Sequence, residues 1–224
     1  MKRLSIAAML EPAARRDEAI GAMKLFHSFA SPFVRKVLVS AHELGVAGAI
    51  EVVTVGTTPV SPDASLATSN PLAKLPTLVL DDGSTLFDSP VICEYLDTTH
   101  GARRLVPAAG PERWRVRRTE ALADGVLDAA VLIRYETHLR PEPLRWADWI
   151  DQQSEKVRRS LDLLEGEVDT WGAELDLGQI AVACALGYLD FRQPVSGHRD
   201  GRPRLLAWYE RFRQRASMQA TEPR

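Results

Sequence analysis

Two serines lie where the first strongly periodic apolar stretch begins, in FHSFASPFVRKVLV at residues 26–39. Ser31 precedes Pro32, and serine followed by proline is typical of a helix N-cap and first turn. The same place can bind an anion, because the first amides of a helix have no partner inside the helix and carry partial positive charge. The stretch therefore indicates either a plain helix cap at Ser31 or an anion site, with Ser28 close by.

A second candidate binding stretch is AKLPTL at residues 73–78, in which Leu75 precedes Pro76. A peptide ligand can pair with exposed main chain as an added strand, and the residue before a cis proline can offer both its N–H and its C=O. X-Pro bonds are cis in only about 5–6% of cases, so the sequence by itself leaves the isomer open.

A third stretch, DSPV at residues 88–91, repeats the serine-proline signature. We expect Ser89 to be an N-cap and Pro90 to begin a helix. A serine at a helix N-terminus can bind a carboxylate through its hydroxyl and the backbone amide, while Asp88 can accept a hydrogen bond from an ammonium group. An ordinary capped helix is the alternative.

The elements that must position these stretches fall into two groups. The first group reads strand, helix, strand, then a hairpin and a helix. Strands are expected at residues 24–28 and 50–55 and on both sides of Asp82-Gly83, with a polar loop at 56–70. One helix is expected at 32–44, ended by Gly45, and a second from Pro90 onward, closed by Gly101.

After residues 101–111 the strand signals stop and long amphipathic helices are expected instead. They cover residues 111–139, 143–171, 176–192 and a stretch around 205–215. The helix at 176–192 is apolar throughout, which predicts that it is the buried helix of this half. Asp176 and Gln179 have the spacing of a reciprocal cap at its start.

Composition excludes several classes of function. The 224 residues are 45% hydrophobic and 26% charged, with a formal net charge of −2. No apolar run approaches the roughly 18–20 residues of a spanning helix, so we expect no membrane partner. The arginine-rich residues 199–215 are interpreted as a solvated helix face, and no nucleic-acid partner is expected. Cys93 and Cys184 are far apart and form no CxxC, so a metal or dithiol site is unsupported.

In their order and spacing, three stretches make the chain resemble the cytosolic glutathione transferases, especially bacterial members with a serine at the first helix. The stretches are FASPFVRK, NPLAKLPTLVLDDGSTLFDSPVICEYLD and LGQIAVACALGYLDFR. The resemblance covers residues 23–217. It implies an α/β plus all-α fold, with a thioredoxin-like N-terminal domain at 23–101, a linker at 102–110 and an all-helical C-terminal domain at 111–224. Residues 1–22 are expected to be a flexible extension or to precede a functional start at Met23.

The resemblance also implies glutathione as co-substrate, without a metal. Ser31 is then the residue that stabilises the thiolate, whose thiol has a pKa of about 8.5 when free; Ser28 stays open as a substitute. Leu75, before a cis Pro76, pairs with the cysteine of glutathione. Lys74 either pairs with its glycine carboxylate or is merely solvated.

At the other end of glutathione, the resemblance assigns Asp88 and Ser89 to the γ-glutamyl group. The electrophile is expected to contact Phe29 and residues of the helix at 111–139, with Arg134 and Tyr135 as candidates. Aromatic residues on such a helix are more often core residues. His138 has no partner visible in the sequence.

Three functions remain open from the sequence. The first is a glutathione transferase that adds the thiolate to a small electrophile, acting in detoxification as a cytoplasmic homodimer. The second is another glutathione-dependent enzyme on the same site: an isomerase, dehalogenase, ether lyase or peroxidase. The third is a non-catalytic protein-binding module of the same fold. The intact Ser31, Pro76, Asp88 and Ser89 favour the enzymes, and the lack of a cysteine at the first helix disfavours disulfide exchange.

Overall fold

A four-stranded mixed sheet carries the N-terminal half of the chain. The computed structural model describes residues 21–100 and 104–224, so nearly all of the extension expected at 1–22, and Gly101, lie outside the described residues. The strands are β1 (Met23–His27), β2 (Ile50–Thr54), β3 (Thr77–Val79) and β4 (Thr85–Leu86). Their order in the sheet is β2-β1-β3-β4, with β1 and β2 parallel and the other two pairs antiparallel.

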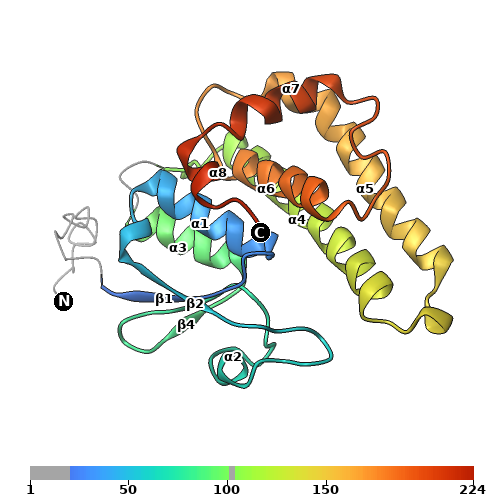
Figure 1. The fold of residues 1–224 in the computed structure, drawn as a ribbon. Coiled ribbons are helices and arrows are strands. Elements are labelled where there is room, and N and C mark those ends of the chain that lie inside the picture. The colour runs from blue at the N-terminus through green and yellow to red at the C-terminus, as the bar shows by residue number, and fades with distance from the viewer. Residues whose placement is uncertain (1–20, 101–103) are drawn as a thin grey trace, which may run out of the picture.

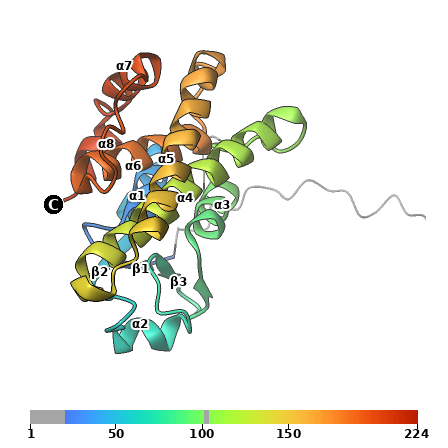
Figure 2. The same cartoon turned by 90° about the vertical axis from the view of Figure 1, so that its right-hand side faces the viewer.

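Two helices, α1 (Pro32–Leu44) and α3 (Ser89–Thr99), cover one side of this sheet, while the short α2 (Ala64–Ser69) lies on the opposite side (Figures 1 and 2). The predicted bounds of α1 are confirmed: Ser31 is its N-cap, and Gly45 ends it in the left-handed region at φ 77°. Helix α3 stops at Thr99 with His100 as its C-cap, directly before Gly101, the residue predicted to close it, which lies outside the described residues.

Helix α2 is a correction, since a loop was expected over residues 56–70. Asp63 is its N-cap, and the Leu66 amide donates to Asp63 Oδ1 at 2.9 Å. Leu66 is the helix's only buried residue. A six-residue helix with one buried position has no apolar period, so the pattern could not reveal it.

The second half is helical, in α4 (Pro111–His138), α5 (Ala147–Glu167), α6 (Leu177–Arg192), α7 (Pro203–Phe212) and α8 (Ala216–Ala220). Helix α6 is buried over most of its length, as predicted, and packs on both α4 and α1 (Figure 1). Apolar side chains of α1, α3, α4 and α6 form one continuous core.

Three details of the helical half differ from expectation. Helix α5 starts at Ala147 instead of residue 143, and short 3-10 turns, η3 (Glu142–Leu144) and η4 (Val168–Thr170), flank it. Helix α8 was not predicted. Asp176 caps α6 as expected, but among the described residues no bond returns from the Asp176 amide to the Gln179 side chain, which instead donates to the carbonyl of Gly172 at 3.1 Å.

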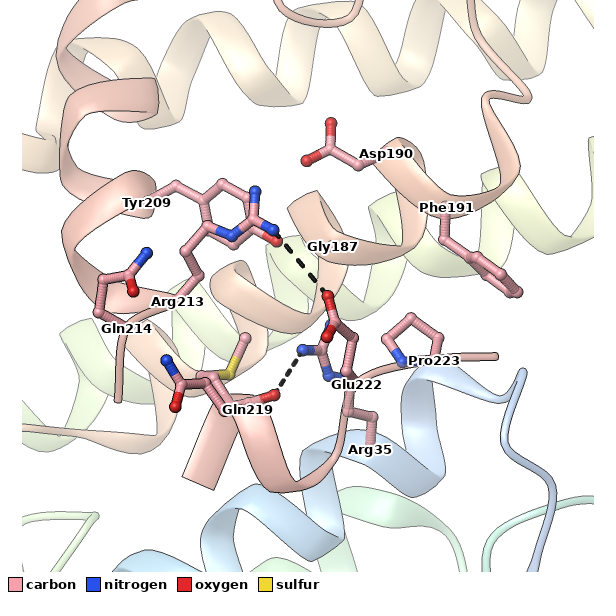
Figure 3. A pocket seen from close by; sticks show the side chains of 11 residues that line it. Arg35, Gly187, Asp190, Phe191, Tyr209, Arg213, Gln214, Gln219, Glu222 and Pro223 are labelled. Carbon is pink, nitrogen blue, oxygen red and sulfur yellow. Dashed lines mark hydrogen bonds and ion pairs between the residues drawn. The ribbon is translucent and has the colours of Figure 1, made fainter. Parts of the chain in front are cut away.

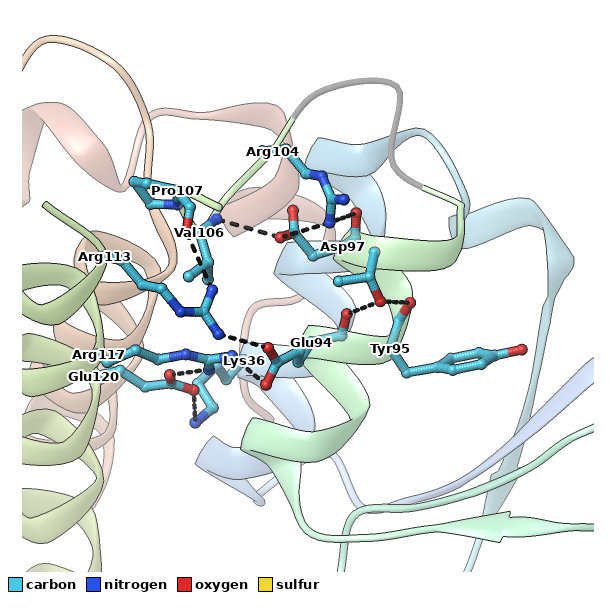
Figure 4. Close-up of polar contacts among 11 residues, drawn as sticks. Lys36, Glu94, Tyr95, Asp97, Arg104, Val106, Pro107, Arg113, Arg117 and Glu120 are labelled. Carbon is cyan, nitrogen blue, oxygen red and sulfur yellow. Dashed lines mark hydrogen bonds and ion pairs between the residues drawn. The ribbon is translucent and has the colours of Figure 1, made fainter. Parts of the chain in front are cut away.

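A buried polar network joins the two halves behind α1 (Figure 4). Lys36 of α1 is fully buried, and its Nζ lies 3.1 Å from Glu120 Oε1 and 2.6 Å from Asp124 Oδ2. Burial by itself lowers the pKa of Lys36, but the two carboxylates outweigh this and raise it. Arg117 links Glu120 to Glu94 of α3. The network therefore holds α1 and α3 in a fixed position against α4.

Candidate functional site

The strand register brings the three candidate stretches to one end of the sheet. Phe26, near the end of β1, pairs with Thr77 at the start of β3. Leu78 pairs with Leu86, so the chain leaving β4 toward Asp88 runs back beside Pro76. The Ser31 turn, which follows β1, the Leu75-Pro76 turn, which precedes β3, and Asp88-Ser89, which follow β4, therefore lie at the same edge.

Ser31 occupies the N-terminus of α1 with a backbone that leaves its hydroxyl free to donate. The Val34 amide donates to Ser31 Oγ at 3.3 Å, and the Ser31 amide donates to the Ser28 carbonyl at 3.0 Å. The predicted N-cap is thus confirmed. Within the described residues the hydroxyl proton of Ser31 has no acceptor, so the oxygen can cap the helix and donate to an anion at once. Ser28 lies on the same hydrogen-bonded turn.

The Leu75-Pro76 bond is cis, which confirms the prediction. The turn that carries it is braced by the buried Asn70, whose side chain donates to the Lys74 carbonyl at 3.2 Å and to Thr77 Oγ1 at 2.9 Å. The β1–β3 register begins at Thr77, and no described residue pairs with the amide or carbonyl of Leu75. These main-chain groups are therefore available to an extended peptide.

The expected N-cap at Ser89 is wrong. Asp88 is the N-cap of α3, and Ser89 and Pro90 are its first two residues. The Asp88 side chain makes no capping bond and is exposed, whereas Ser89 is buried. Because the Asp88 carboxylate is not used by the helix, it is free to accept hydrogen bonds from a cationic ligand group.

Lys74 is exposed beside the cis proline and has no ion-pair partner among the residues that the structure describes. Sequence reasoning missed a carboxylate that faces it, Asp128 of α4. Partial burial raises the pKa of Asp128, the positive charge of Lys74 opposes the rise, and the negative charge of Asp88 adds to it. Through Asp128, helix α4 therefore contributes a carboxylate to the edge at which Lys74 and Asp88 lie. No sequence signal distinguishes it from the other acidic residues of α4.

The residues predicted to contact an electrophile lie on the loop before α1 and near the end of α4. Phe29 is 43% exposed, and its ring meets the ring of His27 edge-on, with 4.5 Å between centroids. Tyr135 is partly buried, which raises its pKa. Arg134 contacts His138, so His138 has a partner that the sequence did not reveal. Both candidates on α4 are thus accessible in part, instead of lying in the core.

Three further residues near these candidates were also missed by sequence reasoning. The guanidinium of Arg224 lies 4.3 Å from the centre of the Phe29 ring, and that of Arg192 lies 4.2 Å from the centre of the Phe191 ring. Tyr188 of α6 is buried; burial raises its pKa to about 12, a rise that Arg192 opposes and Tyr135 adds to.

A polar cavity lies apart from these three stretches. It has a volume of ≈ 320 Å³ and is lined by residues of α1, α6, α7, α8 and the segment after α8 (Figure 3). Arg35 enters it from α1 and donates to the Met218 carbonyl at 3.0 Å. Gly187 of α6 leaves room for the Arg35 guanidinium, since an added Cβ would lie 2.4 Å from Arg35 Nη1.

The cysteines do not contribute a nucleophile. Cys93 and Cys184 are both fully buried, and burial raises the pKa of Cys93 to about 12 and that of Cys184 to about 11. Such thiols stay protonated at neutral pH. Within residues 21–100 and 104–224, no three His, Cys, Asp or Glu side chains are grouped as a metal site would need, and no helix is long and apolar enough to cross a membrane.

A small mixed sheet covered by helices and followed by a helical second half defines the fold of the glutathione S-transferases. Family models for the glutathione S-transferase N-terminal and C-terminal domains match residues 30–99 and 147–211. The chain is 39% identical over 204 residues to the uncharacterized GST-like protein YibF of Escherichia coli (strain K12), covering 90% of this chain and 98% of that protein. The chain belongs to the glutathione S-transferase family.

Solved structures agree with this assignment. A glutathione transferase family member from Pseudomonas fluorescens Pf-5 with bound glutathione is 47% identical, with a TM-score of 0.88, over 90% of this chain and 99% of that chain. A second structure of a family member from the same organism, with bound S-(propanoic acid)-glutathione, is 45% identical with a TM-score of 0.84, over 90% of this chain and 100% of that chain.

Proposed function

We propose that this chain is a glutathione transferase that binds glutathione at the edge formed by Ser31, Leu75 and Asp88 and activates its thiol as a thiolate. The observation that carries the proposal is the strand register. It brings to one place the Ser31 hydroxyl, the unpaired main-chain amide and carbonyl of Leu75, and the Asp88 carboxylate, which does not cap its helix. A tripeptide with a thiol in its middle and charged groups at both ends matches this set.

Each group has a role set by its chemistry. The Leu75 amide and carbonyl pair with the backbone of the cysteinyl residue, which fixes the sulfur near the start of α1. Asp88 accepts from the γ-glutamyl ammonium, and Ser89, at the first turn of α3, binds the neighbouring carboxylate. Lys74 is the candidate for the glycine carboxylate.

Ser31 then lowers the pKa of the bound thiol. Its hydroxyl donates to the sulfur, and the partial positive charge at the start of α1 favours the ionised form. The thiolate lone pair forms a C–S bond to the electrophile. The displaced electron pair leaves with a leaving group or moves to the adjoining carbon, which takes a proton from water.

Two solved structures support this assignment. The Pseudomonas fluorescens structures contain glutathione and S-(propanoic acid)-glutathione, so the fold that this chain shares holds both glutathione and an S-substituted derivative there. On the family resemblance we also propose a homodimer that acts on a small electrophile in the cytoplasm, in detoxification. Sedimentation at micromolar concentration measures the oligomeric state.

Retention on immobilised glutathione, with elution by free glutathione, tests binding. Turnover of a panel of electrophiles and peroxides with glutathione then separates the transferase from peroxidase and related reactions. A matched control is Asp82→Ala, which removes an exposed aspartate in the β3–β4 hairpin instead of Asp88. Retention of both Asp82→Ala and Asp88→Ala to the same extent as the native chain overturns the assigned site.

A further inference from the structure

Most arginines of the helical half are neutralised by carboxylates. Ion pairs within the described residues engage Arg113, Arg115, Arg117, Arg118, Arg140, Arg158, Arg159, Arg199, Arg202, Arg204, Arg213 and Arg215. Arg134, Arg145, Arg192, Arg211 and Arg224 are exceptions, since no described carboxylate forms an ion pair with any of them. Three of these five lie by the residues predicted to contact the electrophile. Arg134 is one of those residues, Arg224 contacts Phe29, which is another, and Arg192 is near enough to Arg134 to lower its pKa.

Arg224 is held beside the turn that carries Ser31. Its guanidinium stacks on Phe29, two residues before Ser31, at 4.3 Å from the ring centre. The segment that leads to it is fixed along α1 by hydrogen bonds from Arg215 to Glu43 at 2.7 and 2.8 Å and from Arg35 to the Met218 carbonyl at 3.0 Å. The cation therefore has a defined position near the mouth of α1, where the chain end also lies in both views (Figures 1 and 2).

Arg192 approaches the same region from the end of α6. It stacks on Phe191, and Phe191 lies on the same side of the cavity as Pro223, the residue before Arg224 (Figure 3). The carboxylates nearest in sequence are engaged elsewhere: Asp190 accepts from Arg199 at 2.6 and 2.8 Å and contacts His198, and Glu222 faces Arg213.

Arg134 completes the group from α4. Partial burial lowers its pKa, and the positive charge of Arg192 lowers it further. Two like charges thus lie close enough to repel each other, and neither has an ion pair with a described carboxylate. Like charges brought together without a protein counter-ion are typical of a place that an anionic ligand occupies.

We propose that Arg134, Arg192 and Arg224 form a cationic rim that binds a carboxylate of the electrophile, so that the second substrate is a small anionic electrophile. The inference rests on the proposed transferase function. In the addition to an unsaturated carboxylate, the thiolate lone pair forms the C–S bond, the π pair moves to the carbon beside the carboxylate, and that carbon takes a proton from water.

The rim aids this step in two ways. It offsets the repulsion between the incoming carboxylate and the thiolate, and it stabilises the negative charge that grows on the carboxylate side as the π pair moves. Arginine suits both tasks, because its planar guanidinium binds a carboxylate through two parallel hydrogen bonds.

Two non-reacting products test the rim by binding alone. S-(2-carboxyethyl)glutathione and S-(2-carbamoylethyl)glutathione have the same shape. They differ in one group of the S-substituent, which is a carboxylate in the first compound and a neutral amide in the second. Calorimetric titration of the full chain is expected to show the acid binding about tenfold more tightly, the ratio that one charge-assisted hydrogen bond supplies. The preference is expected to fall to about twofold in Arg192→Gln and in Arg224→Gln and to persist in the control Arg211→Gln, an exposed arginine of α7.

The outcomes separate the two proposals. Equal affinities for acid and amide in the native chain, with glutathione still bound, overturn the rim and leave the transferase assignment standing. An unchanged preference in both rim variants likewise overturns it. A native chain that binds neither product nor glutathione overturns the proposed function, and the rim with it.

Discussion

Removal of the Ser31 hydroxyl tests the proposed chemistry directly. In Ser31→Ala the bound sulfur loses one donor, while the groups assigned to the ends of glutathione at Asp88 and Ser89 are unchanged. A charge-assisted hydrogen bond contributes about 1.5–3 kcal/mol, and 1.36 kcal/mol corresponds to one pKa unit, so the pKa of the bound thiol is expected to rise by about one to two units. Glutathione itself should still bind.

The same hydroxyl also caps α1, so the change has a second effect that must be separated from the first. The 3.3 Å bond from the Val34 amide is lost, which costs about 1 kcal/mol of folding stability. Ser31→Gly is the matched control, because glycine caps a helix almost as well as serine but has no hydroxyl. Both variants should raise the thiol pKa equally, and only Ser31→Ala should lower the melting temperature appreciably.

The assay follows thiolate absorbance in the ultraviolet against pH with glutathione saturating. If the thiol pKa in both Ser31 variants stays within about 0.3 unit of the native value, the hydroxyl does not contact the sulfur and Ser31 is only a cap. Ser28→Ala is then the variant to measure, since Ser28 lies on the same turn.

Three further changes have defined outcomes. Asp88→Ala should weaken glutathione binding in calorimetry by about ten- to hundredfold, the worth of a charge-assisted hydrogen bond; a change below about twofold contradicts the assignment. Lys36→Met removes the cation from Asp124 and leaves the buried Glu120 with Arg117 alone, so denaturant unfolding should show a loss of about 3–5 kcal/mol, and a loss below about 1 kcal/mol contradicts the network. Asp190 has a folded pKa lowered to about 2: burial opposes the shift, and hydrogen bonds from His198 and Arg199 outweigh it. Because its folded pKa is depressed, ionised Asp190 contributes about 2 kcal/mol of stability above pH 4, and this contribution is lost as the pH falls toward 2. In an acid titration, the difference in stability between the native chain and Asp190→Asn should therefore shrink between pH 4 and pH 2. A constant difference refutes the hydrogen-bonded ionised state.

Elements with strong local signals could be predicted from the sequence. Helix α1 has a serine and a proline at its start and a glycine at its end, and both bounds were found. The β3–β4 hairpin was found from Asp82-Gly83, with Gly83 at φ 82°. Helix α2 has one buried residue and α8 only two, so neither has a period to detect, and both were missed.

The candidate site divides in the same way. Ser31, Leu75-Pro76 and Asp88-Ser89 stand in local motifs, where a cap, a proline or a helix start marks them. Asp128, Arg192 and Arg224 do not, because their spacing on a helix or near the chain end shows only that they are not in the core. Which exposed side chain faces the neighbouring domain depends on how the two halves pack, and that packing is set by buried contacts such as Lys36 with Glu120.

The sheet register explains why the order of the motifs is more informative than any one of them. A serine cap, an X-Pro bond and an Asp-Ser helix start each occur in many unrelated folds. In this chain the serine cap follows β1, the X-Pro bond precedes β3, and the Asp-Ser helix start follows β4. Because β3 is antiparallel to β1 and β4 is antiparallel to β3, this order brings all three motifs to one edge. Reversal of any one strand would send its motif to the opposite end of the sheet. The order of the three motifs in the sequence therefore determines that they lie together in the structure. The charged residues that the helical half adds to that edge are not fixed by this order, so we expect substrate choice to depend on residues such as Arg192 and Arg224.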